Sequence, residues 1–199
     1  MSSDLARLDE DRALILAGIS HDLRTPLTRL RLAAEMSADA ATREGISADI
    51  DEMDKIIGQF LDFARDTEGE SPEPTNINSV VLHITEPLQR RGARIELHLA
   101  ELPPLMLRPL ALLRLASNLI NNALRHGGRT APVEVQTRRE EGRIILEVMD
   151  RGPGIPPEEA ERLKQPFTRL ETARTGAASA GLGLAIVDRV ARGHGGRFD

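Results

Sequence analysis

Hydrophobic residues in the first third of the chain recur every three or four positions, the spacing that places them on one face of an α-helix. Two runs show this spacing, and their members are Leu16, Ile19, Leu23, Leu27, Leu30 and Ala34, then Ile46, Ile50, Met53, Ile57, Phe60 and Ala64. The residues between them, Ser37-Ala38-Asp39-Ala40, are typical of a turn, so the two helices are expected to lie antiparallel. One hairpin cannot bury an apolar stripe on each helix, and a second copy of the chain is the simplest partner. The pattern therefore predicts a dimeric four-helix bundle.

A proline lies inside the first of these helices. Pro26 removes one backbone hydrogen bond and predicts a kink near His21. The residues just before it combine an imidazole nucleophile (His21), a carboxylate that can accept its proton (Asp22) and, one turn later, a hydroxyl (Thr25). The alternative interpretation of this segment is a solvated helix face with a tolerated proline.

The composition of the chain changes near Asp66. Residues 1–66 carry 14 acidic and 8 basic side chains, a net charge of −6, whereas residues 67–199 carry 17 and 18, a net charge of +1. Residues 67–75 are polar, contain one glycine and two prolines, and show no periodicity, which is typical of a linker. We therefore expect a helical domain over 1–66, a linker over 67–75 and a second domain over 76–199.

The second domain mixes strands with helices. Residues 133–137 and 143–149 have strand-like sequences separated by a turn at 140–142. Residues 110–125 are expected to form a helix that carries Asn118 and Asn122 on one face. Amide oxygens at this spacing suit Mg²⁺, which needs few protein ligands. Hydrogen bonds from these amides to neighbouring backbone are the alternative.

Two glycine-bearing segments complete the candidate chemistry. Asp150-Arg151-Gly152-Pro153-Gly154 follows the second strand, and Gly181-Leu182-Gly183-Leu184 opens a helix that continues to about Arg192. Glycines allow close backbone approach, and free N–H groups at a helix start favour phosphate. A simple turn and an ordinary helix start are the alternatives for the two segments. No Walker-type phosphate loop occurs in the sequence.

The composition excludes several classes of protein. Among 199 residues there is no cysteine, which excludes disulfides, Cys-ligated zinc and a thiol nucleophile. The net charge of −5 argues against general binding to nucleic acids or anionic membranes. No apolar stretch approaches the roughly 18 residues that span a bilayer.

Five motifs occur together and in a recognisable order. They are S-H-D-L-R-T-P-L, N-L-I-N-N-A-L-R-H, D-R-G-P-G-I, Q-P-F-T-R and G-L-G-L-A-I-V. This series resembles the H, N, G1, F and G2 boxes of sensor histidine kinases over about residues 5–199, and it is most similar to the EnvZ-like osmosensor class. The resemblance implies an α + α/β chain: a dimerisation and phosphotransfer hairpin (DHp, HisKA), then an ATP-binding α/β sandwich of the Bergerat type (GHKL, HATPase_c).

The resemblance also implies roles for the residues of the first motif. His21 would be the phosphoacceptor that attacks the γ-phosphate of ATP. Asp22 would be the general base, and Arg24 would support the transfer electrostatically. Thr25 matches the position that dephosphorylates the partner regulator.

The remaining motifs would bind the nucleotide. Asn122 would hold Mg²⁺, Asn118 would assist near the phosphates, and Arg125 would contact phosphate. His126 would contact the nucleotide as a ring, and Asp150 would accept a hydrogen bond from the adenine amino group. The other residues of the implied nucleotide site are Gly152 and Gly154 beside the base, Phe167 before a lid over 168–180, and Gly181, Leu182, Gly183 and Leu184 beside the triphosphate.

The implied activity is ATP-dependent autophosphorylation of His21 and transfer to an aspartate in an OmpR-like response regulator, with regulator phosphatase activity as well. The implied assembly is a homodimer, the cytoplasmic part of a bacterial inner-membrane protein whose membrane segments lie outside this chain. Basic Arg24, Arg29 and Arg31 suit docking of an acidic regulator pocket, although a solvated charged face is equally consistent with them.

The sequence departs from the family pattern at its end. Two or three strands would follow the last helix, whereas this chain stops at 194–199, so the sandwich is expected to be incomplete at its C-terminus. The alternative function is a non-catalytic dimeric signalling or docking module with weak nucleotide binding.

Overall fold

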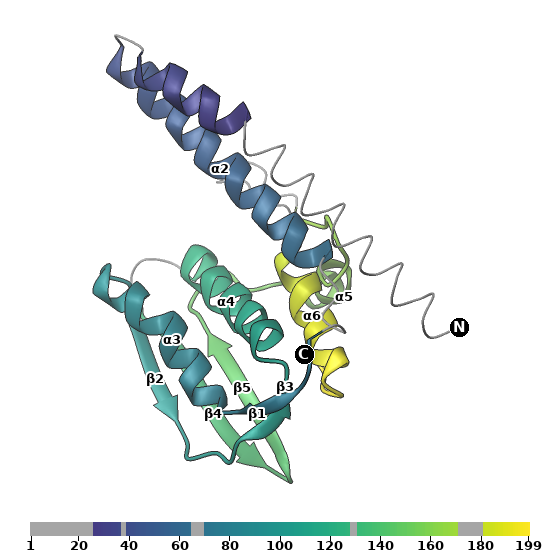
Figure 1. Cartoon of the computed structure of the whole chain (residues 1–199). Helices are drawn as coiled ribbons and strands as arrows, with labels where there is room; N and C mark the ends of the chain where they lie inside the picture. The colour runs from purple at the N-terminus through teal and green to yellow at the C-terminus, as the bar shows by residue number, and fades with distance from the viewer. Residues whose placement is uncertain (1–25, 37–38, 65–69, 128–130, 171–180) are drawn as a thin grey trace. The chain divides into compact units, whose positions relative to one another are not determined.

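A computed structural model describes residues 26–36, 39–64, 70–127, 131–170 and 181–199 (Figure 1). The chain divides into two compact units, residues 1–66 with 169–182 and residues 67–168 with 183–199. The elements in chain order are α2 (Ala40–Ala64), β1 (Glu73–Thr75), α3 (Ile77–Arg90), β2 (Ile95–Leu99), β3 (Leu105–Leu107), α4 (Pro109–His126), β4 (Val133–Glu140), β5 (Arg143–Met149), α5 (Pro157–Leu163) and α6 (Gly183–Gly193).

The first unit contains a helix over residues 26–35 followed by α2. Asp39 caps the N-terminus of α2. Its carboxylate accepts a hydrogen bond from the backbone N–H of Thr42 at 3.0 Å and another from the Thr42 hydroxyl. This is the usual way to satisfy a free N–H group in the first turn of a helix. The same hydrogen bonds hold the pKa of Asp39 below its ordinary value. Residues 37–38 of the turn expected over 37–40 lie outside the described residues, and its last residue, Ala40, is already the first residue of α2.

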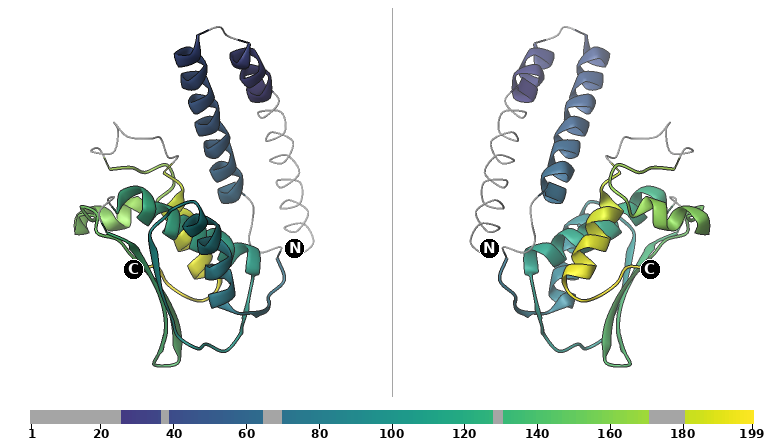
Figure 2. Two further views of the ribbon diagram at one scale, coloured as in Figure 1. Left: turned by 90° about the vertical axis from the view of Figure 1, so that its left-hand side faces the viewer. Right: turned by 90° about the vertical axis from the view of Figure 1, so that its right-hand side faces the viewer.

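The two helices of this unit pack along an apolar seam. Leu27, Ala34 and Ile50 are buried, and an Arg31–Asp51 ion pair joins the two helices. The predicted antiparallel pair is confirmed over the described residues, and Figure 2 shows the two helices side by side. The predicted kink near His21 lies outside the described residues.

The main sheet of the second unit has the strand order β2-β4-β5. Strand β2 runs parallel to β4, and β4 runs antiparallel to β5. The tight turn between β4 and β5 needs left-handed backbone, with φ of 49° at Glu141 and 79° at Gly142. The predicted pairing of these two strands is confirmed.

A second, two-stranded sheet pairs β1 with β3 antiparallel, and Thr75 lies opposite Leu105. The expected linker over 67–75 therefore needs a correction, because its last three residues are a strand of the second unit. Pro74 obscures this in the sequence. A proline cannot donate to a sheet, but an edge strand tolerates it.

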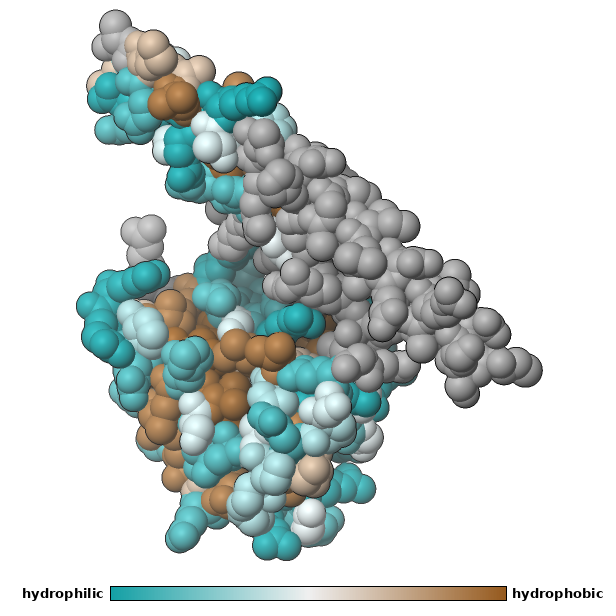
Figure 3. All heavy atoms as spheres, viewed as in Figure 1, coloured by the Kyte–Doolittle hydropathy of each residue, from teal (hydrophilic) through white to brown (hydrophobic). Residues whose placement is uncertain are grey.

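Helices α3, α4 and α6 lie on one face of the main sheet, as the two views of Figure 2 show. Val81, Ile120 and Val135 are almost fully buried in the core between these layers. In the space-filling view of Figure 3, apolar residues gather between α3 and α4, with polar residues around them. On the opposite face of the sheet a bidentate Arg138–Glu147 ion pair, 3.1 Å at each contact, crosses from β4 to β5.

Five elements have no counterpart in the sequence prediction: β1, α3, β2, β3 and α5. The strands are short, and Pro87 lies inside α3, so their local signals are weak. Within the described ranges, none of the helices has both the length and the apolar character needed to cross a membrane.

Candidate functional site

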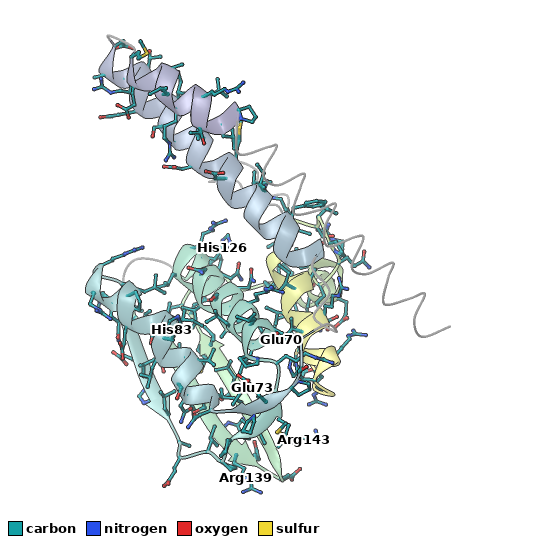
Figure 4. The ribbon with its side chains drawn as sticks, viewed as in Figure 1. Glu70, Glu73, His83, His126, Arg139 and Arg143 are labelled. Atoms are coloured by element: carbon teal, nitrogen blue, oxygen red, sulfur yellow. The ribbon has the colours of Figure 1, made fainter. Side chains whose placement is uncertain are left out.

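Helix α4 carries the two asparagines. It begins at Pro109, whose missing N–H costs nothing at the first helical position, and its apolar face is buried in the core. Asn118, Asn122 and Arg125 follow at intervals of four and three residues, so they share one face of the helix. His126 is the last residue of α4, and Figure 4 shows it at the end of the helix opposite to Glu70.

Asn118 lies against the start of α6. Its amide nitrogen donates to the carbonyl of Arg114 at 2.8 Å, so the backbone-bonded alternative holds for this half of the side chain. Its oxygen Oδ1 would lie 3.2 Å from a Cβ placed on Gly183. Only a residue without a side chain allows this approach comfortably. The structure thus brings the asparagine motif and the second glycine motif together.

Asn122 is half-buried one turn further along the same face. Within the described part of the chain, no hydrogen bond to its side-chain amide is recorded, unlike that of Asn118. The oxygen of a side-chain amide is a suitable ligand for a hard cation such as Mg²⁺. The residues present therefore fit a site in which Asn122 holds the metal.

The first glycine motif lies against the C-terminal end of α4. A Cβ on Gly152 would lie 2.3 Å from the carbonyl oxygen of His126 and 2.8 Å from Oδ1 of Asp150. The Gly152 N–H donates to that same Oδ1 at 2.8 Å. The Asp150 side chain is thereby oriented by the backbone two residues further on, and its second oxygen remains available at the exposed surface.

Two effects lower the pKa of His126 and one raises it. Partial desolvation, the largest cause, lowers its pKa, and the positive charge of Arg125 lowers it further, while Asp150 acts in the opposite direction. The neutral ring is therefore favoured near neutral pH.

The other described residues of the predicted site differ in exposure and in backbone conformation. Phe167 is 63% exposed and has a φ of 62°. Gly154 also has left-handed backbone, with a φ of 75° and open space around it. Gly181 has a φ of 67°, Leu182 is fully buried and Leu184 is half-buried.

The predicted catalytic motif lies outside the described residues. This holds for His21, Asp22, Arg24 and Thr25, and for residues 171–180 of the predicted lid.

Gly127 is a site residue that the sequence prediction missed. A Cβ there would lie 2.5 Å from the carbonyl oxygen of Ala123 and 2.6 Å from Cβ of Asp150, so glycine is needed for β5 to end beside α4. The signal was a glycine directly after the last helical residue, the usual place of a helix cap. Its contact with Asp150 could not be read from that position.

Two protein families match consecutive parts of the chain. Residues 11–69 match the His Kinase A (phospho-acceptor) domain. Residues 108–199 match the family described as histidine kinase-, DNA gyrase B-, and HSP90-like ATPase.

Curated relatives and a solved structure agree with this assignment. Sensor histidine kinase GtrS of Pseudomonas aeruginosa is 36% identical over 98% of the chain, and a histidine-protein kinase/phosphatase, MprB of Mycolicibacterium paratuberculosis, is 34% identical over 96%. The chain spans 40% of the length of each. Full-length ShkA, in a crystal structure with AMPPNP, has a TM-score of 0.70 and 26% identity over 92% of this chain and 42% of ShkA. The motifs, the fold and these matches agree, and the chain belongs to the sensor histidine kinases, with a HisKA domain followed by a HATPase_c domain.

Proposed function

We propose that this chain is the catalytic core of an ATP-dependent protein-histidine kinase in a two-component system. The observation that carries the proposal is the convergence on α4 of two separate segments, residues 150–152 and the start of α6. Gly183 approaches Asn118 at the middle of the helix, and Gly152 and Asp150 approach its C-terminal end at His126 and Gly127. Each approach uses a glycine, which lets the backbone of the segment pack directly against a residue of α4 or of the neighbouring motif.

The nucleotide would lie along α4 between these segments. Asp150 would accept a hydrogen bond from the adenine amino group through the oxygen that Gly152 leaves available, and the neutral His126 ring would pack against the nucleotide. Gly152 and Gly154 would allow the base to approach the backbone. Asn118 and Arg125 would contact the phosphates, with Gly181, Leu182, Gly183 and Leu184 along the triphosphate and Phe167 before the lid.

Asn122 would hold a Mg²⁺ ion that accompanies the nucleotide. When bound, such an ion neutralises charge on the phosphates, which is a large part of what phosphoryl transfer requires.

In the transfer itself, a ring nitrogen of His21 would attack the γ-phosphorus of ATP. A nitrogen–phosphorus bond forms, the bond from the γ-phosphorus to the bridging oxygen breaks, and ADP leaves with the electron pair. Asp22 would orient the imidazole and accept the proton on its other nitrogen, and Arg24 would offset the negative charge.

The phosphoryl group would then pass to an aspartate of a response regulator with an OmpR-like receiver domain. Thr25 would position water for the reverse reaction, dephosphorylation of that regulator. The name of MprB, a kinase/phosphatase, supports this second activity. Membership of the EnvZ-like osmosensor class rests on the motif sequences and stays a prediction.

A homodimer is the proposed assembly. In the first unit Leu30 is 51% exposed and Met53 48% exposed although both belong to the predicted apolar seam, so the hairpin leaves an apolar face for a second copy. The proposed location is the cytoplasmic part of a bacterial inner-membrane protein.

Incubation with γ-labelled ATP and magnesium tests the proposal. We expect an acid-labile label on the chain, lost in His21→Gln and strongly reduced in Asn122→Ala. Asn121→Ala is the matched control, because Asn121 is exposed on the same helix turn and outside the proposed site.

A label that survives His21→Gln would contradict the proposal. Absence of measurable Mg-ATP affinity would instead favour the alternative, a non-catalytic dimeric signalling or docking module.

A further inference from the structure

The N-terminus of α4 is capped by a residue from a distant part of the chain. The Glu70 carboxylate accepts hydrogen bonds from the backbone N–H groups of Leu110 and Ala111, at 2.6 and 3.0 Å. These N–H groups have no partner within the helix, and negative charge is favoured at this end. Such caps usually come from the residue just before the helix, but Arg108 at that position makes no side-chain cap.

Arg108 holds the backbone of the same glutamate. Its Nε donates to the carbonyl oxygen of Glu70 at 2.9 Å, and its Nη1 donates to the carbonyl oxygen of Gly193 at 3.0 Å. Its own N–H donates to Nε2 of His194 at 3.0 Å. Glu70 is thus bound through both side chain and backbone, and Figure 4 shows it beside the lower end of α4. We call Glu70, Arg108 and the N–H groups of Leu110 and Ala111 the Glu70–Arg108 latch.

The latch lies where the hairpin chain enters the second unit. Helix α2 ends at Ala64, so Glu70 is six residues beyond it, a covalent span of at most about 20 Å. If the latch opened, the first residue after α2 held in place by strand pairing would be Glu73, which pairs with Leu107. The chain between Ala64 and that residue would then be nine residues long, with a reach of at most about 30 Å.

We propose that the Glu70–Arg108 latch sets the length of the tether between the hairpin and the nucleotide-binding unit, and thereby how often bound ATP meets His21. The inference rests on the proposed kinase function and adds a regulatory element to it. Once a tether is long enough to span its two sites, the effective concentration of the tethered partners falls with roughly the 3/2 power of tether length. For a six-residue tether that already spans the sites, lengthening to nine residues lowers the transfer rate by about twofold.

The test uses the chain of 199 residues in three variants. Glu70→Gln weakens the latch with little change of shape, and Glu73→Gln is the matched control, an exposed glutamate three residues further on. The third variant inserts Gly-Ser-Gly after Asp66, which lengthens the tether while the latch is kept. For each we would measure amide exchange at Leu110 and Ala111, the Kd for Mg-ATP and the autophosphorylation rate at saturating ATP.

A fourth measurement reports on the tether without catalysis. The chain has no cysteine, so spin labels can be attached at Ala48→Cys on α2 and His98→Cys on β2, both exposed positions. Labelled chains are diluted with unlabelled chains so that distances within one chain dominate.

We expect Glu70→Gln to speed amide exchange, broaden the distance distribution and slow autophosphorylation about twofold, with an unchanged Kd. The insertion should reproduce the last three results without faster exchange, and Glu73→Gln should match the unmodified protein. The proposal would be overturned if Glu70→Gln showed the distances and autophosphorylation rate of the unmodified chain, or if its only change were weaker Mg-ATP binding. Glu70 would then be a helix cap only. If the unmodified chain is not phosphorylated by γ-labelled ATP, the proposed kinase function is wrong. Amide exchange and the spin-label distances would still show whether the latch limits the length of the tether.

Discussion

Single glycines determine how closely the segments of the candidate site approach α4. At Gly127, Gly152 and Gly183 an added Cβ would meet an atom of another site residue within 3.2 Å. The Gly127 and Gly152 contacts are the tightest, and both involve backbone carbonyl oxygens, which cannot rotate away as a long side chain does. We therefore expect these two positions to be the most sensitive to small substitutions.

Gly152→Ala should weaken Mg-ATP binding by about tenfold or more, which corresponds to about 1.4 kcal/mol. The added methyl group would displace the His126 carbonyl or Asp150 Oδ1, the oxygen through which the Gly152 N–H orients the carboxylate. Isothermal titration measures the affinity. Gly58→Ala, on α2 with open space around it, is the control and should bind as the unmodified chain does. Equal affinities in the two variants would contradict the proposed role of Gly152.

The lowered pKa of His126 predicts a pH dependence of stability. The folded state binds this proton more weakly than the unfolded state, so the stability that the neutral ring provides is present above about pH 6.5 and is lost as the pH falls below it. We expect His126→Gln to show a smaller loss of thermal stability than the unmodified chain between about pH 7.5 and pH 5.

His83→Gln is the control for this measurement, since it removes an exposed histidine of α3 that lies outside the candidate site. A His126→Gln profile parallel to that of the unmodified chain would show that His126 does not contribute.

At the scale of elements, α4 joins the core to the candidate site. Ala116, Ile120 and Ala123 bury one side of the helix, and Asn118 and Asn122 occupy the neighbouring face. The core therefore fixes the rotation of the helix, and with it the direction in which the asparagines point. The N-terminus of the same helix carries the Glu70 carboxylate, so one element connects the latch with the nucleotide site.

Helix α2 allows a prediction about stability. Gly45 lies within the helix with open space around it, and glycine is about 1 kcal/mol less favourable than alanine in a helix interior. Gly45→Ala should therefore raise the free energy of unfolding by up to about 1 kcal/mol. Urea unfolding at fixed protein concentration measures it. A loss of stability would indicate that this part of α2 contacts another chain too closely for a methyl group.

At the scale of the whole molecule, the exposed apolar face of the hairpin predicts the oligomeric state. We expect the chain to sediment as a dimer and Met53→Glu to shift it toward the monomer, because a charge on this face would be buried in the bundle. Met106→Glu is the matched control, as Met106 is 62% exposed on β3 in the other unit. Equal dimer fractions in both variants would contradict a dimer formed through this face.

Much of this protein was predictable from local patterns in the sequence. The apolar periodicity predicted the two helices of the hairpin, and two strand-like runs separated by a turn predicted β4 and β5. Helix α4 was also predicted from its sequence. The interval of four between Asn118 and Asn122 predicted that both lie on one face of this helix. These features depend on residues close together in the chain, where the period of the backbone directly decides which side chains share a face.

The tertiary structure decided which distant residues meet. Asn118 faces Gly183, Gly127 packs on Asp150, and Glu70 caps α4 only because the helices and the sheet pack in one particular arrangement. Strand β1 likewise exists through its pairing with β3, although its sequence resembles a linker. Such contacts join segments with no sequence signal in common, so their physical cause is the packing of the core and the pairing of backbone groups rather than any local preference.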